Sequence, residues 1–249
     1  MEAYFISDIH LKSVNERNGQ VLLRFLHSLV PDAGPGLHLF LLGDIFDLWL
    51  SDHAIFIKKY YSIIEIFKEL RQKGAKLYYF EGNHDLHLSP YWRDQLGFEV
   101  YDKAAYFELG GRTVRVEHGD EINQDDLAYL RLRKFVRSMP IEFLAHYLPG
   151  KFWEEVGKLA SHTSRKYSTD YRERTGPLLQ EMIRKHALRG FESKPFDLIV
   201  SGHMHIKDDY EFDRTGGIRV RSINLGSWFD ESGPQAFYMN SEKMEWIKL

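Results

Sequence analysis

Short apolar runs recur along the chain, and each is four to seven residues long. They are rich in β-branched and aromatic residues and are bounded by Gly, Asp or Asn, which is typical of buried strands. We therefore predict eight strands: Ala3–Ser7, Leu37–Leu42, Lys76–Phe80, Thr113–Glu117, Asp197–Ser201, Ile218–Asn224, Ala236–Met239 and Met244–Leu249.

Longer amphipathic stretches separate several of these strands. In Arg17–Val30 and Ala54–Lys73, apolar side chains recur three and four positions apart, which predicts helices, and Gly74 fits a C-cap. Turn residues at Gly110–Gly111 and Arg214–Gly217 predict hairpins, so part of the sheet is antiparallel. Strands alternating with helices indicate a layered α/β (α+β) fold.

Residues 124–190 break this rhythm. They show helical patterns and no convincing strand, with interruptions at Pro140, Pro149-Gly150 and Gly176-Pro177. This stretch holds thirteen Lys/Arg and eight Asp/Glu, a net charge of +5, so the rest of the −3 chain carries −8. We predict a basic helical insertion, called the cap below, within a single domain of residues 1–249. Solvated helix faces are the alternative explanation of the individual charges.

Composition excludes several classes of protein. The chain has 249 residues, twelve histidines and no cysteine, which excludes disulfides, thiolate metal sites and a cysteine nucleophile. Its net charge of −3 argues against a general nucleic-acid-binding protein. No apolar run reaches the length of a membrane span, and the N-terminal MEAYFISDIH lacks the basic region of a signal peptide. We expect a cytoplasmic protein.

Potential metal ligands directly follow five of the predicted strands. In a layered α/β sheet such residues gather beyond the carboxyl ends of the strands, so we expect them to converge. A single histidine of this kind is usually an ordinary loop residue, but five such clusters, each after a predicted strand, together indicate a metal site. The clusters are Asp8 and His10; Asp44 and Asp47; Asn83, His84 and Asp85; His118; and His203 and His205.

Carboxylate, imidazole and amide groups without thiolate suit Mn²⁺, Fe²⁺ or Zn²⁺. Residues two apart on an extended segment point to the same face, so Asp8 and His10 can hold one ion together, as can His203 and His205. Asp44 is best placed to bridge two ions about 3.5–4 Å apart. Glycines that allow sharp turns precede three of the clusters: Gly43, Gly82 and Gly202.

This order of motifs resembles the calcineurin-like metallophosphoesterase superfamily, whose pattern is D-x-H, GD-x-x-D, GNH[DE], H and GH-x-H. The chain shows all five over residues 1–123 and 194–249. The resemblance implies a four-layer αββα sandwich with a helical insertion cap. It implies one ion held by residues Asp8, His10, Asp44 and His205, and a second held by Asp44, Asn83, His118 and His203.

The resemblance also implies a division of labour in hydrolysis. Water activated by the two ions attacks phosphorus, His84 protonates the leaving oxygen, and Asp85 orients His84. Asp47 either supports the metal ligands without binding an ion itself or caps a loop or helix.

Within the superfamily, GDIFDLW and HGDEINQDDLAYLRLRKFVRS resemble the branch that cleaves UDP-2,3-diacylglucosamine to lipid X and UMP in lipid A biosynthesis, usually with Mn²⁺. That resemblance implies substrate contacts from Asn83, Tyr129, Ser164, Arg165 and Lys166. The branch commonly has GNRD where this chain has GNHD. A broader phosphodiesterase or phosphatase acting on soluble nucleotides therefore stays as an alternative, as does a non-catalytic scaffold.

The cap fits an anionic lipid-linked sugar nucleotide and the anionic inner face of the inner membrane, because it is basic and aromatic. Its apolar residues either line an acyl-chain groove or pack between helices: Phe135, Phe143, Leu144, Tyr147, Leu148, Phe152 and Trp153. The remaining histidines receive no role: His27, His38, His53, His87, His146, His162 and His186.

Overall fold

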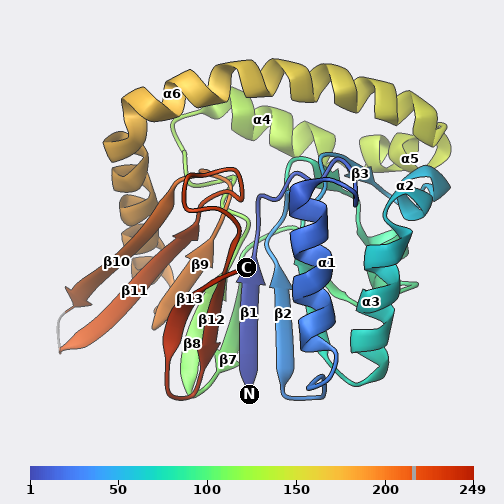
Figure 1. The fold of residues 1–249 in the computed structure, drawn as a ribbon. Coiled ribbons are helices and arrows are strands. Elements are labelled where there is room, and N and C mark those ends of the chain that lie inside the picture. The colour runs from blue at the N-terminus through green and yellow to red at the C-terminus, as the bar shows by residue number, and fades with distance from the viewer. Residues whose placement is uncertain (215–216) are drawn as a thin grey trace.

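Two twisted β-sheets form the centre of the molecule (Figure 1). The computed structural model describes residues 1–214 and 217–249, without the side chains of residues 157–175, 214 and 218. In spatial order the first sheet contains β13 (Met244–Lys248), β12 (Gln235–Asn240), β1 (Glu2–Ile6), β2 (Leu37–Leu41), β4 (Lys76–Phe80) and β6 (Glu99–Tyr101). The second contains β10 (Lys207–Arg214), β11 (Ile218–Leu225), β9 (Leu198–Ser201), β8 (Arg112–Val116) and β7 (Ala105–Leu109).

The two sheets pack face to face, because alternate strand residues such as Phe5 and Phe40 meet Val114 and Val200 in one buried cluster. Helices α1 (Arg17–Leu29) and α3 (Tyr61–Gln72) cover the outer face of the first sheet. The C-terminal part of α6 (Gly150–Ser193) covers the second sheet through Ala187. The predicted four-layer αββα architecture is confirmed.

All eight predicted strands are present, each with boundaries within one residue of the prediction. The two predicted hairpins are formed by β7 with β8 and by β10 with β11. The single helix predicted over Ala54–Lys73 is instead two, α2 (Ala54–Lys59) and α3, which are separated at Tyr60. Two very short strands, β3 (Trp49–Leu50) and β5 (Asp85–Leu86), and the π-helical turn η1 (Ser89–Arg93) complete the core.

Between β8 and β9 the chain forms α4 (Leu127–Val136), α5 (Met139–Tyr147) and α6, which arch over one edge of the sheets (Figure 1). Helix α6 continues through Gly176-Pro177, so the predicted interruption there is wrong. A proline inside a helix costs one hydrogen bond, but Pro177 is exposed and the following turns are held against the second sheet. No helix among the described residues is long and apolar enough to cross a membrane.

Candidate metal centre

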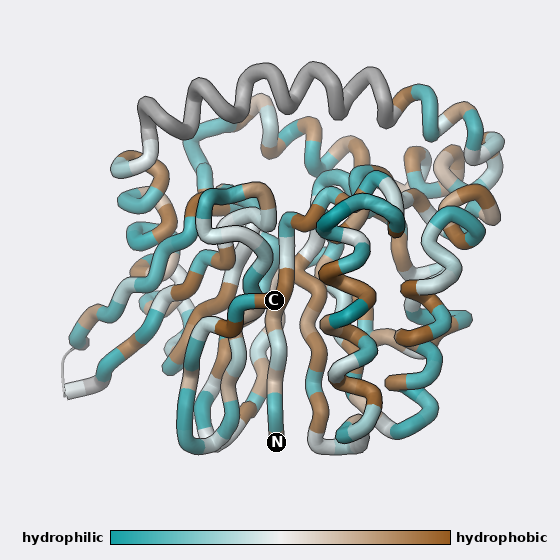
Figure 2. The backbone as a smooth tube through the Cα atoms, viewed as in Figure 1, coloured by the Kyte–Doolittle hydropathy of each residue, from teal (hydrophilic) through white to brown (hydrophobic). Residues whose placement is uncertain are grey.

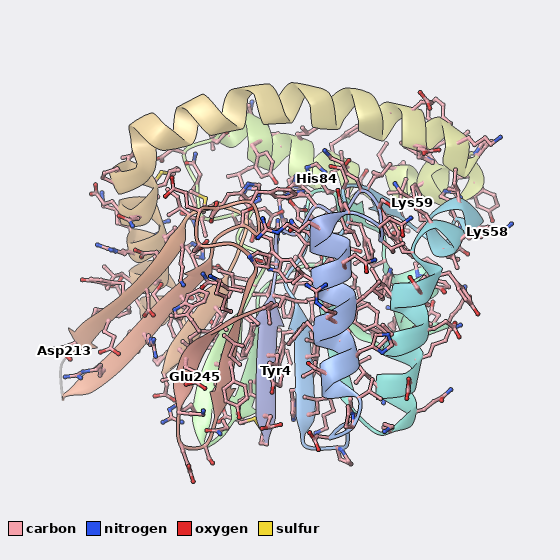
Figure 3. The ribbon with its side chains drawn as sticks, in the orientation of Figure 1. Tyr4, Lys58, Lys59, His84, Asp213 and Glu245 are labelled. Carbon is pink, nitrogen blue, oxygen red and sulfur yellow. The ribbon has the colours of Figure 1, made fainter. Side chains whose placement is uncertain are left out.

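Strands β1, β2 and β4 run parallel in one sheet, and β8 and β9 run parallel in the other. The loops after all five strands meet at the edge under the cap, where His84 lies (Figure 3). Five potential ligands in these loops have left-handed backbone conformations with φ between 46° and 66°: Asp8, His10, Asp44, His203 and His205. Such conformations cost about 1–3 kcal/mol each, and they cluster at functional sites.

The first group of potential ligands consists of Asp8, His10, Asp44 and His205, whose ligand atoms lie within 4.8 Å of one another. The Nε2 atoms of His10 and His205 face each other at 3.0 Å, and His205 Nε2 lies 3.1 Å from Asp8 Oδ1. Asp8 Oδ1 is buried and has no hydrogen-bond donor among the described residues. Two imidazole nitrogens in close contact and an unpaired buried carboxylate oxygen fit a shared cation.

The second group consists of Asp44, His118 and His203. His118 Nε2 lies 3.2 Å from His203 Nδ1 and 3.9 Å from Asp44 Oδ1, while His10 of the first group lies 3.8 Å from Asp44 Oδ2. The two oxygens of Asp44 thus face different groups. His118 Nδ1 donates to the Leu42 carbonyl at 2.6 Å, which leaves Nε2 available as a ligand.

Two glycines make the close approach of these loops possible. A Cβ on Gly82 would lie 2.1 Å from Asp44 Oδ1, and a Cβ on Gly202 would lie 2.4 Å from Asp8 Oδ2. Neither distance is compatible with a side chain. The predicted role of these glycines in bringing ligands together therefore comes from their lack of a Cβ, not from their φ angles.

The pKa values of most of the potential ligands are shifted toward the forms that bind a cation, neutral imidazole and ionised carboxylate. Burial lowers the pKa of His10 and of His203 to about 4, so both imidazoles are neutral near pH 7. Burial opposes ionisation of Asp44 and Asp8, but neighbouring histidines outweigh it and lower the pKa of both carboxyl groups. Burial likewise opposes a charge on His118, while Asp44 raises its pKa above the ordinary value.

Asp85 does not hold the His84 ring. It is fully buried, and its two oxygens accept hydrogen bonds from the backbone N–H groups of Asp44, Ile45 and Gly82 and from the Tyr79 hydroxyl. The expectation that Asp85 orients His84 is therefore wrong, because the carboxylate joins the loops after β2 and β4 instead.

His84 itself is held by other groups. Its Nδ1 donates to the Asp47 carbonyl at 2.8 Å, and its backbone N–H donates to Asp44 Oδ1 at 2.9 Å. Burial opposes a charge on the ring, but Asp44 and the Asp47 carbonyl raise the pKa of His84 above its ordinary value. The side chains of Asp47, His10 and His84 also lie close enough to form a third group of potential ligands.

The remaining predicted site residues have varied surroundings. Asn83 is exposed in the loop after β4. The Tyr129 ring of α4 lies 5.8 Å from the His203 ring, and its hydroxyl is buried with no hydrogen-bond partner among the described residues. Burial raises the pKa of that hydroxyl. The side chains predicted at Ser164, Arg165 and Lys166 lie outside the described residues.

Three groups that support the centre were missed in the sequence. The Asn224 amide donates to the Gly202 carbonyl at 2.7 Å, and the Ser227 hydroxyl donates to the Asp8 carbonyl at 3.3 Å. Arg137 of the cap contacts two of the ligand loops. Arg137 stands four residues after Arg133, a helical spacing that places both side chains on one face.

Four of the histidines without a predicted role hold parts of the fold together. His53 and His87 donate to carbonyl oxygens of the cap, those of Ala145 and Val136. His38 contacts the Tyr78 hydroxyl, and His186 of α6 pairs with Glu117. These contacts agree with structural roles.

The sequence of motifs and the geometry together define a class. The calcineurin-like phosphoesterase family model matches residues 1–207, and the chain belongs to this family of metal-dependent phosphoester hydrolases. Among curated relatives, "UDP-2,3-diacylglucosamine hydrolase" of Photobacterium profundum is 29% identical, over 92% of this chain and 90% of its own. Proteins of the same name from Neisseria gonorrhoeae and Vibrio atlanticus are 27% and 24% identical, over 92% and 98% of this chain and 90% and 98% of their own.

Proposed function

We propose that the protein hydrolyses the pyrophosphate bond of UDP-2,3-diacylglucosamine, releasing 2,3-diacylglucosamine 1-phosphate (lipid X) and UMP. Water adds to phosphorus as the bond to the bridging oxygen breaks. The observation that carries the proposal is a two-part cluster of metal-type side chains, joined at Asp44, beside a basic cap with an apolar surface. The relatives bearing this name align over more than nine tenths of the chain, which supports the substrate.

The two groups of side chains fit two divalent ions. Residues Asp8, His10, Asp44 and His205 would hold one, and Asp44, Asn83, His118 and His203 would hold the other. The chemistry supplied by such ions when bound is activation of water and neutralisation of charge on the phosphoryl oxygens. Manganese is the proposed metal, with Fe²⁺ and Zn²⁺ as alternatives, since all donors are oxygen or nitrogen.

We assign His84 as the proton donor to the leaving oxygen. Because Nδ1 is engaged by the Asp47 carbonyl, Nε2 is the atom that holds the transferable proton. Burial opposes the charged ring, but Asp44 and the Asp47 carbonyl raise the pKa of His84 above its ordinary value, which favours the protonated form that a general acid needs.

The cap has the charge and the apolar surface that the nucleotide and the acyl chains of this substrate would need. Its net charge of +5 suits a pyrophosphate and a nucleotide, and Tyr129, Ser164, Arg165 and Lys166 are the proposed contacts to the polar head. Acyl chains need apolar surface, and Figure 2 has apolar segments along α4 and α5. Five of the predicted apolar cap residues are exposed: Phe135, Phe143, Leu144, Tyr147 and Phe152.

We also propose that the surface of the cap that carries these exposed apolar residues binds an anionic membrane, with the protein peripheral to the inner face of the inner membrane. Exposed aromatic side chains next to basic residues are typical of helices that bind lipid headgroups, and each basic residue near the surface contributes about 1 kcal/mol. The substrate is itself a membrane lipid, so binding at the surface brings it within reach.

The decisive experiment measures UMP release from UDP-2,3-diacylglucosamine by Mn²⁺-loaded protein. We expect turnover by the wild type and none by a His118→Ala control. Hydrolysis of bis(p-nitrophenyl) phosphate without turnover of the lipid would favour the broader phosphodiesterase. Fewer than one ion per chain after metal loading, with no hydrolysis, would favour a scaffold.

A further inference from the structure

Two arginines, Arg133 of α4 and Arg137 at the C-cap of that helix, reach from the cap to the loop that carries His118. Arg133 Nε donates to Asp120 Oδ2 at 2.6 Å, and Arg137 Nη1 donates to the same oxygen at 3.1 Å. Asp120 is buried and stands two residues after His118. The cap is thereby fastened directly to one of the ligand loops.

Arg137 also grips a second ligand loop. Its Nη2 donates to the carbonyl oxygens of Gly82, at 2.9 Å, and Glu81, at 3.2 Å, immediately before Asn83 and His84. One guanidinium therefore bridges the loops after β4 and β8. The Arg137 side chain is only 9% exposed, so it is positioned to hold the loops and not to meet substrate.

We propose that Arg137 is a positioning residue that sets the spacing between the loop of Asn83 and His84 and the loop of His118. A planar guanidinium has five N–H donors in a fixed fork, so it can satisfy a carboxylate on one side and two carbonyl oxygens on the other. A lysine ammonium has three donors at one point and cannot span the same gap. The proposal depends on the proposed hydrolysis only for its kinetic test.

The bridge also couples the cap to the site. Tyr129 lies on α4, two turns before the C-cap residue Arg137, and its ring contacts His203. The placement of α4 against His203 and the spacing of the two bridged loops are consequently set by one rigid element.

The first test uses metal-free protein and hydrogen–deuterium exchange. Arg137→Gln should raise exchange on the order of tenfold for amides in residues 82–86 and 118–121, because both loops lose their common partner. Arg137→Lys should give a smaller rise. The matched controls Arg131→Gln and Arg131→Lys, at an exposed position on the same helix, should leave exchange unchanged.

The second test uses Mn²⁺-loaded protein and bis(p-nitrophenyl) phosphate, a substrate too small to need the cap's proposed contacts with the nucleotide and the acyl chains. Arg137→Gln should lower kcat by roughly tenfold to a hundredfold with KM changed by less than about twofold, and Arg137→Lys should restore part of the loss. Wild-type exchange and wild-type kcat in Arg137→Gln would overturn the proposal. A uniform rise in exchange along the whole chain would also overturn it, since that marks general destabilisation. If the wild type hydrolyses neither substrate, the proposed function fails while the exchange result still decides the role of Arg137.

Discussion

Asp8, His10, Asp44, His203 and His205 have left-handed backbone conformations, which side chains with a Cβ rarely adopt. These conformations carry backbone strain, and the side chains that they present lie within the two groups of potential ligands. The sequence shows the residue types and their order, and these were sufficient to predict that the side chains of Asp8, His10, Asp44, His118, His203 and His205 converge. The φ angles could not be predicted, because neighbouring loops impose them through contacts such as the hydrogen bond from the His203 N–H to Asp8 Oδ2.

Gly202→Ala should weaken metal binding by roughly tenfold to a hundredfold, because the new Cβ would overlap Asp8 Oδ2 and displace the carboxylate. Calorimetric titration of the metal-free protein with Mn²⁺ measures the effect. Gly34→Ala is the matched control, since a Cβ there has no described atom within 4 Å. Equal affinities in both variants would mean that Asp8 takes no part in holding the metal.

His38 should make the fold less stable in acid. Burial lowers its pKa to about 4, below the value of about 6.5 for an unfolded chain. The unfolded state therefore binds the proton more readily, and stability is lost as pH falls from about 6.5 to 4. In the presence of a metal chelator, His38→Phe should reduce the fall in unfolding free energy over this range by about 1–3 kcal/mol, the upper figure being the full effect of the pKa difference and the lower one allowing for solvent screening. His27→Phe, at an exposed position on α1, should follow the wild type; an identical profile for His38→Phe would refute the assignment.

At the scale of elements, apolar periodicity predicted strand and helix positions well but not interruptions imposed by tertiary contacts. Residues 54–73 keep helical spacing throughout, yet Tyr60 leaves the helical conformation, with φ −113° and ψ 22°. Its side chain is fully buried and its hydroxyl donates to the Leu11 carbonyl at 2.6 Å. That partner lies 49 residues away in sequence, so no local pattern could reveal it.

Tyr60→Phe should lower the free energy of unfolding by about 1 kcal/mol, because the buried Leu11 carbonyl loses one of its donors. Urea titration followed by circular dichroism provides the measurement. Tyr61→Phe offers a neighbouring control whose side chain is 57% exposed, and it should change stability little. Similar losses in both variants would exclude this hydrogen bond as the cause.

For the candidate site, the location could be predicted from the sequence but several of the supporting contacts could not. Strand ends after β1, β2, β4, β8 and β9 gave its location, because parallel strands finish at a common edge. The contacts of Asp85 and Arg137 were beyond reach, because they join loops whose separation depends on how the sheets and the cap pack. Spacing predicts which residues share an edge, whereas packing determines which atoms touch.

At the scale of the whole molecule, the cap differs in charge from the rest of the chain and has an unusual apolar surface. Its exposed apolar side chains include Met139, Phe143 and Tyr147, successive positions on one face of α5. An exposed apolar stripe of this kind is costly in water and marks an interaction surface. It supports the proposed contact of the cap with lipid.

Tyr147→Ser should reduce co-sedimentation with vesicles containing anionic lipid by several-fold, since it removes an aromatic anchor from α5. Binding of the wild type should also fall as salt rises, because the basic residues are screened. Tyr61→Ser, which removes a similarly exposed tyrosine from α3, should bind as the wild type does. Salt-independent binding, or equal losses in both variants, would contradict the proposed orientation.

The cap is attached to the body of the molecule at both ends. Arg133 and Arg137 hold α4 to the ligand loops after β4 and β8, while His186 and Ala187 hold the end of α6 to the second sheet. A lid joined at one end opens by swinging about that end, whereas this span is also held between its ends by the contact of His53 with the Ala145 carbonyl of α5, so it cannot swing as one rigid lid. We therefore expect lipid and nucleotide to enter and leave sideways beneath the arch, and turnover to be free of the slow opening step that limits many lidded enzymes.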